Sequence, residues 1–219
     1  MTTMALRAFR SNPGLGGFGG ESTSVTINAQ DCDAFAQIVK ELVDNAVDAC
    51  CCPSQSNSTN SNSGNSATAE PKRVRVTMER FDDDDDDDND TQLLEVTVTD
   101  NGGGMQNIQH CVEAFRTSKA PSTTMIGDNQ TQEDKTTGRY GIGLTLCLLH
   151  AQRLVPNHYA TITSATTKQK HFTKASYVVD TDGDKVQCVK REKIPKNAKN
   201  ESGTAVKLLI PVSTNPTRL

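Results

Sequence analysis

Apolar positions recur with a helical period in "IVKELVDNAVDAC", residues 38–50. Polar residues interrupt this run, and Glu41, Asn45 and Asp48 follow one another at i, i+4 and i+7, which places them on one helical face. With its flanks, the pattern predicts a helix that is capped by Asp31 and runs to about Cys52.

The polar row on this helix has two interpretations. A solvated face of an amphipathic helix is the ordinary one for this stretch alone. Against it, no lysine or arginine stands four residues after Glu41, and Asn45 is a poor helix former. A carboxylate and an amide one turn apart also suit a hydrated hard cation and a water.

Apolar and polar positions alternate in several later segments, which predicts strands. "KRVRVTMERF" and "TQLLEVTVTD" resemble the arms of a hairpin, and four more strands are expected in "YATITSAT", "FTKASYVVDT", "KVQCVKRE" and "GTAVKLLIPV". A short strand is expected in "STSVTI", and helices in "QNIQHCVEAF" and at the end of "GRYGIGLTLCLLHAQRL". The predicted fold class is an α/β (α+β) two-layer sandwich, with a mostly antiparallel mixed sheet and about three helices on one face.

Two low-complexity segments interrupt this pattern. Residues 53–70 are rich in Ser and Asn and read as disordered, residues 82–90 are an acidic run, and residues 117–137 read as a long loop. The acidic run supplies eight of the 27 acidic residues, so the remaining 19 face 23 Lys and Arg, a balance of about +4. A mildly basic body is compatible with an anionic partner without requiring one.

The cysteine content argues against a disulfide framework or a zinc site. The 219-residue chain has seven cysteines, an odd number, with no CxxC pair and no matching histidine spacing. No apolar run is long enough for a signal peptide or a membrane span. We therefore expect one intracellular domain in a reducing compartment, without a membrane partner.

Three further stretches carry candidate chemistry. In "VTVTDNGGGM", Asp100 ends a strand before a glycine bend, where a carboxylate could accept a hydrogen bond from an exocyclic amine such as that of adenine. In "TTGRYGIGLTL", glycines stand before a helix, as in a phosphate cradle, although the spacing is neither a P-loop nor a Rossmann fingerprint. Each could equally be an ordinary turn, and Thr204, at the start of the last strand, carries no signal by itself.

In this order, ExxxN, DxGxG, the glycine loop and GTxV resemble the GHKL (Bergerat-fold) ATPases, which include gyrase B-type topoisomerases, Hsp90, MutL-type proteins and histidine kinases. The resemblance covers residues 31–211 apart from the two inserts. "FRTSKAP" followed by "TTGRYGIGLTLCLLHAQ" looks most like the B-type ATPase subunit of topoisomerase VI and its eukaryotic relatives, and "RAFRSNPGLGGF" is similar to the strap that opens that subunit.

The resemblance implies a role for each site residue. Glu41 would be the general base, Asn45 would hold Mg²⁺ against the phosphates of ATP, and Asp44 and Asp48 would support them. Asp100 would bind adenine and Thr204 would lie near the water beside it. The remaining nucleotide contacts implied are Gly102, Gly104, Met105, Ser118, Lys119, Gly138, Arg139, Tyr140, Gly141, Ile142, Gly143, Leu144 and Thr145.

The same resemblance implies the wider function. Residues 1–30 would be a strap and residues 31–219 an ATPase domain, without the transducer that follows it in the family. The domain would be the ATP-driven dimerisation gate of a type IIB DNA topoisomerase, or of its meiotic B-like variant, working on DNA in the nucleus with a DNA-cleaving A-like subunit. The alternatives are a non-hydrolysing Bergerat-fold scaffold and a MutL- or Hsp90-like ATPase.

Overall fold

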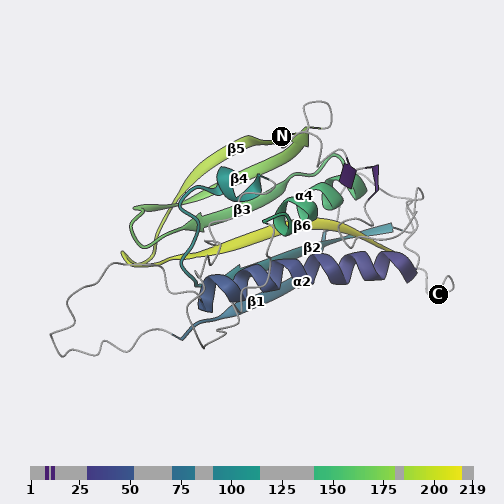
Figure 1. Ribbon diagram of the computed structural model, residues 1–219. Helices are drawn as coiled ribbons and strands as arrows, with labels where there is room; N and C mark the ends of the chain where they lie inside the picture. The colour runs from purple at the N-terminus through teal and green to yellow at the C-terminus, as the bar shows by residue number, and fades with distance from the viewer. Residues whose placement is uncertain are drawn as a thin grey trace, which may run out of the picture.

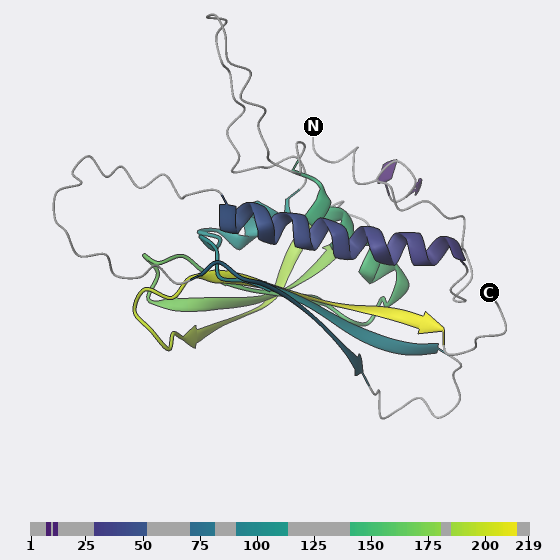
Figure 2. The same cartoon turned by 90° about the horizontal axis from the view of Figure 1, so that it is seen from below.

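The computed structural model describes residues 8–9, 11–12, 29–51, 71–81, 91–113, 141–180 and 185–213. Within these residues, helices cover one face of a six-stranded sheet and the other face is open (Figures 1 and 2). The helices are α2 (Ala29–Cys51), α3 (Ile108–Val112) and α4 (Gly143–Leu154). The strands are β1 (Val74–Phe81), β2 (Thr91–Asp100), β3 (Ala160–Ala165), β4 (His171–Asp180), β5 (Lys185–Pro195) and β6 (Gly203–Ser213).

The strand order is β1-β2-β6-β3-β4-β5, and every pairing is antiparallel. The predicted hairpin is confirmed, since β1 pairs with β2 from Val74 opposite Asp100. The last strand, β6, lies in the centre between β2 and β3. Its register sets Thr204 opposite Asp100 on one side and opposite Ser164 on the other, so three polar side chains meet at one end of the sheet.

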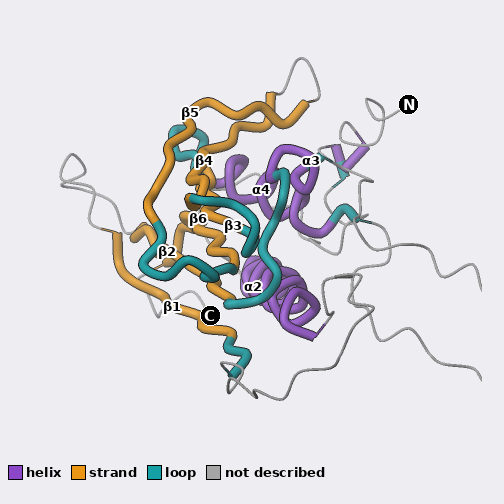
Figure 3. Tube along the Cα trace, turned by 90° about the vertical axis from the view of Figure 1, so that its left-hand side faces the viewer, coloured by secondary structure: helices purple, strands orange, loops and turns teal. Residues whose placement is uncertain are grey.

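The core lies between the sheet and the two longer helices. α2 packs over β1, β2 and β6, whereas α4 packs over β3, β4 and β6 (Figure 3). Buried residues of α2 such as Ile38 and Leu42 belong to one hydrophobic cluster with Val96, Leu148 and Leu208. The helices also touch each other, because the Cys147 thiol of α4 donates to the Ile38 carbonyl of α2 at 3.9 Å. This contact brings the polar row of α2 beside the start of α4.

The ends of the helices differ from the sequence-based predictions. α2 begins at Ala29, so Asp31 lies in its first turn and is not the N-cap. Ala and Gln are good helix formers, and an acid in the first turn is favourable with the helix dipole. α3 is only five residues long and ends at Val112, with Glu113 as its C-cap. The predicted strand at residues 22–27, both inserts and the loop at residues 117–137 lie outside the described residues.

No helix among the described residues has both the length and the apolar character that crossing a bilayer requires.

Candidate functional site

Glu41 lies at the junction between α2 and α4. Its Oε1 accepts a hydrogen bond from Gln37 Nε2 at 2.8 Å, and its Oε2 occupies the space that a β-carbon at Gly143 would fill. Gly143 opens α4, whose N-cap residue, Ile142, makes no side-chain hydrogen bond to the first turn. A carboxylate is therefore held against an uncapped helix N-terminus, where the helix dipole favours negative charge.

Cys147, one turn further along α4, is affected by this carboxylate. Burial raises the pKa of the Cys147 thiol well above its usual range, and the negative charge of Glu41 raises it further. Cys147 is fully buried, so its thiol serves as a small core side chain at neutral pH. The polar row therefore borders the core on this side.

The rest of the polar row is not a solvated face. Asp48 is only 6% exposed, and Asn45 is half-buried. Asn45 makes no side-chain hydrogen bond to any described residue. Asp44 differs, because its Oδ2 forms an ion pair with Lys40 at 2.6 Å on the exposed side of the helix. The structure therefore separates Asp44 from the row that contains Glu41, Asn45 and Asp48.

Asp100 is the second buried acid of the site, with 8% of its surface exposed. Its Oδ1 accepts a hydrogen bond from the Gly102 amide at 2.8 Å. Burial raises the pKa of Asp100, and the backbone N–H groups of Gly102 and Thr204, together with the charge of Lys72, offset part of that rise. A buried carboxylate with such a pKa is a strong acceptor for a neutral N–H donor.

The glycine turn after Asp100 fits between α2 and β3. A β-carbon at Gly102 would lie 2.5 Å from the Ala49 carbonyl oxygen, and Gly103 N donates to that same oxygen at 3.2 Å. Gly104 has φ +70°, and a β-carbon there would collide with the backbone of Ala165. The predicted bend is confirmed, and side chains are excluded from it on both sides.

Ser164 joins the turn that follows β2 to the end of β3 and the start of β6, and sequence reasoning missed it. Its fully buried hydroxyl accepts from Met105 N at 2.8 Å, donates to the Gly203 carbonyl at 2.9 Å, and lies 2.9 Å from Thr204 Oγ1. One signal could have found it. Ser164 follows Ala160 and Ile162 on the inward side of an alternating strand, where a polar residue needs a partner.

The glycine loop is only partly described. Gly141 has φ +64°, and Ile142 and Gly143 lead from it into α4. Leu144 is buried, and the buried Thr145 hydroxyl donates to the Val112 carbonyl at 2.8 Å. Both side chains are therefore packed inside the domain. Only the backbone of these two residues could face a ligand. The remaining candidates of this group lie outside the described residues: Ser118, Lys119, Gly138, Arg139 and Tyr140.

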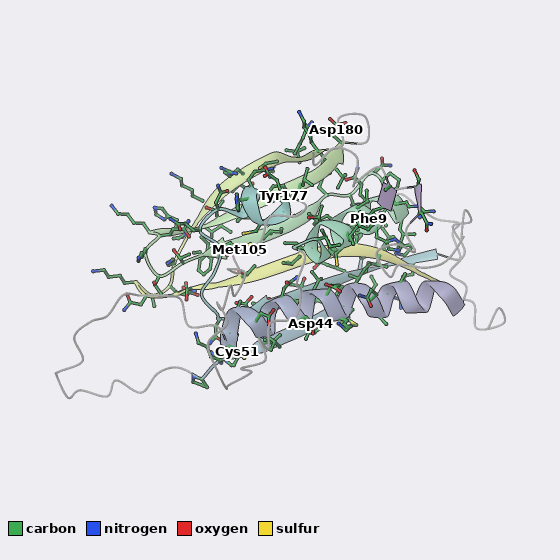
Figure 4. All side chains as sticks on the ribbon, viewed as in Figure 1. Phe9, Asp44, Cys51, Met105, Tyr177 and Asp180 are labelled. Atoms are coloured by element: carbon green, nitrogen blue, oxygen red, sulfur yellow. The ribbon has the colours of Figure 1, made fainter. Side chains whose placement is uncertain are left out.

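One helix joins the two halves of the site. Glu41 marks the end beside α4, and Ala49 marks the end beside the glycine turn, eight residues further along α2. At 1.5 Å per residue the two points are about 12 Å apart, a separation comparable to the length of a nucleoside triphosphate. Figure 4 shows Met105 near the same end of α2 as Cys51, with Asp44 further along the helix.

A protein-only metal site is not present in the described part of the chain, which contains no cluster of three His, Cys, Asp or Glu side chains. A magnesium ion bound through substrate phosphates needs only one or two protein oxygens, because it keeps several waters. The amide of Asn45, which makes no side-chain hydrogen bond within the described ranges, fits that requirement.

Comparisons with known proteins place the chain in a family. The model of the histidine kinase-, DNA gyrase B-, and HSP90-like ATPase family matches residues 30–213. No curated protein sequence matches the chain. Among solved structures, the ATPase and transducer domains of DNA topoisomerase II from Balamuthia mandrillaris are similar, with a TM-score of 0.47 and 13% identity. That match covers 80% of this chain and 37% of the topoisomerase chain. Because the family model spans most of its length, the chain belongs to the histidine kinase-, DNA gyrase B-, and HSP90-like ATPase family.

Proposed function

We propose that the chain is an ATP-binding and hydrolysing gate domain of the kind found in the B-type ATPase subunit of topoisomerase VI. One observation carries the ATPase part. Helix α2 sets the Glu41 carboxylate against the uncapped start of α4, and it supports the Asp100 glycine turn about two turns away. A carboxylate that can activate water at the phosphate end and a buried acceptor at the base end are what ATP hydrolysis with recognition of adenine requires.

At the base end, Asp100 would accept a hydrogen bond from the exocyclic amine of adenine. The carboxylate is held by the Gly102 amide, and glycines at positions 102 and 104 leave no side chain in the way. The hydroxyl pair of Ser164 and Thr204 lies at the same end of the sheet, where it could hold a water beside the base.

At the phosphate end, Glu41 would orient the attacking water and accept its proton as the water oxygen bonds to the γ-phosphorus and the bond to ADP breaks. Gln37 fixes the rotamer of Glu41 by holding Oε1, which leaves Oε2 at the start of α4. Backbone N–H groups there can stabilise the phosphate oxygens. Mg²⁺, held by Asn45 and the phosphates, would neutralise charge on the triphosphate.

The topoisomerase assignment is the finer part of the proposal and rests on the sequence motifs. "FRTSKAP" and "GRYGIGLTL" favour the type IIB branch over MutL- and Hsp90-like ATPases. ATP would join two copies, and hydrolysis would release them while a separate A-like subunit cleaves DNA in the nucleus. A scaffold that binds ATP without hydrolysing it is the alternative, and the presence of Glu41 and Asn45 argues against it.

The ATPase proposal is tested by Glu41→Ala. Loss of a general base should reduce hydrolysis on the order of 100-fold or more, whereas ATP affinity measured by calorimetry should stay within a few-fold of wild type. Glu95→Ala is the matched control, because Glu95 pairs with Lys207 on the open face of the sheet. Parallel losses of binding and hydrolysis in Glu41→Ala would show that Glu41 is structural.

The gate proposal is tested by sedimentation with a non-hydrolysable ATP analogue. The chain should change from monomer to dimer when the analogue is added and return to monomer with ADP. A chain that stays monomeric with the analogue bound would contradict the gate but leave the ATPase proposal standing.

A further inference from the structure

Basic side chains gather at one end of the sheet. The strand register places the start of β1, the turn between β3 and β4, and the turn between β5 and β6 at this end. Figure 4 shows many side chains with blue nitrogen tips extending from it. We call this surface the lysine end; it consists of Lys72, Arg75, Lys168, Lys170, Lys193, Lys196 and Lys199.

The lysine end is not neutralised by the described acidic residues around it. Asp100 is buried and Glu192 pairs with Lys190 at 2.6 Å, whereas Glu201, which accepts hydrogen bonds from the backbone amides of Asn197 and Ala198, offsets only one of the seven basic residues. Among the described residues, none forms an ion pair with the exposed turn and strand-end lysines: Lys168, Lys170, Lys193 and Lys199. Within the described part of the chain, basic side chains without an ion-pair partner are therefore concentrated here.

The turns that carry the lysines are held in place. Lys196 Nζ donates to the Thr166 carbonyl at 2.8 Å and lies 5.7 Å from the centre of the Phe172 ring, so it ties one turn to the other. Gln169 accepts from Thr166 N at 2.7 Å and donates to the Gln106 carbonyl at 3.2 Å. These bonds fix the positions from which the unpaired lysines extend.

We propose that the lysine end binds the phosphate backbone of duplex DNA. The six strands span about 24 Å at a spacing near 4.8 Å, which corresponds to about seven base pairs along the axis of a duplex at 3.4 Å each. Flexible lysines at that spacing neutralise phosphates without reading bases.

The surrounding surface favours a duplex over other polyanions. The exposed large hydrophobic residues of the described chain are Val47, Val76, Met78, Tyr159 and Val189, and none lies in either lysine turn. Membrane-surface binding usually adds an apolar anchor, and single-strand binding adds exposed stacking rings. The choice of DNA over duplex RNA rests on the proposed function. The description of the charged surface does not depend on that function.

The test compares two triple variants with equal loss of charge. Lys168→Gln/Lys170→Gln/Lys199→Gln removes three turn lysines, and Arg80→Gln/Arg153→Gln/Lys185→Gln removes three basic side chains near the opposite end of the sheet. Binding to a labelled duplex is followed by fluorescence anisotropy from about 50 to about 200 mM salt, without nucleotide. Thermal melting of each variant checks that it is folded.

The turn triple should bind the duplex about tenfold more weakly or worse, and its log–log salt slope should fall by about 2 to 3. The control triple should change affinity less than about threefold, because charge more than a Debye length away is screened. Equal losses in both triples would overturn the proposal, as would tighter binding of duplex RNA or of phosphatidylserine vesicles than of duplex DNA. If the wild type hydrolyses ATP but does not bind duplex DNA, this inference fails and the ATPase proposal stands.

Discussion

At the scale of single residues, the burial of Asp100 lowers the stability of the fold, and the same carboxylate is proposed to bind adenine. Its carboxylate is removed from water, and burial raises its pKa. The folded state therefore holds the Asp100 proton more tightly than the unfolded state does. It follows that Asp100 lowers stability as the pH rises through its folded-state pKa, and that this effect is absent below the pKa of an unfolded aspartate.

Substitution of Asp100 should reveal the effect of its ionisation on stability. Relative to Asp100→Asn, which cannot ionise, the wild-type melting temperature should fall as the pH is raised from about 3 to 7. A melting series over that range measures the trend. If the difference between the two proteins does not vary with pH, the Asp100 carboxylate is not buried as described.

The same position should govern the affinity for ATP. Asp100→Ala leaves the adenine amine without its acceptor. An unpaired buried polar group costs about 2 kcal/mol, which corresponds to a dissociation constant roughly 30-fold larger. Calorimetric titration of wild type and variant measures this. An unchanged affinity would mean that adenine does not contact Asp100.

At the scale of elements, two glycines should respond differently to the same added methyl group. At Gly104 the β-carbon would meet the Ala165 backbone with φ at +70°, whereas at Gly143 its three nearest neighbours would all be atoms of the Glu41 side chain. Gly104→Ala should lower the stability by about 2 kcal/mol or more, and Gly143→Ala by less than about 1.

The activities of the two glycine variants should show the reverse order. Gly143→Ala displaces the Glu41 carboxylate from the start of α4, so it should reduce hydrolysis at saturating ATP by at least about tenfold while the protein stays folded. Denaturant melts and steady-state hydrolysis rates measure both quantities. A Gly143→Ala protein with normal hydrolysis would show that Glu41 is not the base.

The connection between α2 and β1 should tolerate shortening. Cys50 Sγ lies 3.7 Å from the Arg73 carbonyl oxygen, and Asn101 bonds to the backbone of Arg73 and Pro71, so both ends of the connection are anchored close together. Deletion of residues 55–69 should change the melting temperature by less than about 3 °C, because loop-closure entropy varies slowly with length. A larger fall would show that these residues pack against the domain.

The helices and strands with strong hydrophobic periodicity were predicted well from the sequence. The hydrogen-bond partners of individual side chains were predicted less well. The strands of the sheet follow from alternation, and Glu41, Asn45 and Asp100 stood out because polar residues interrupt apolar patterns. The strand order could not be read from the sequence, because it depends on β6 inserting between β2 and β3. Ser164 was missed for the same reason, since its partners, Met105 and Thr204, are brought to it only by that order.

At the scale of the whole molecule, the candidate site is a property of the assembled sheet. Its parts come from α2, the end of β2, the end of β3, the start of β6 and the start of α4, which are far apart in the sequence. None of these segments forms the site alone. A ligand that contacts several of them binds only the folded chain and must stabilise it.

ATP should therefore raise the melting temperature of the whole chain. At 100 times its dissociation constant, a ligand specific for the folded state adds about 2.7 kcal/mol, which corresponds to roughly 5–10 °C for a domain of this size. The shift should shrink when EDTA removes Mg²⁺, because Asn45 would then lack the ion that links it to the phosphates. GTP is the sharpest control, since it carries a carbonyl where adenine has the amine that Asp100 would bind. Thermal melts with ATP, with ATP and EDTA, and with GTP at the same concentration measure all three effects. An equal shift with GTP would contradict recognition of adenine by Asp100, and no shift with saturating ATP would contradict the nucleotide site itself.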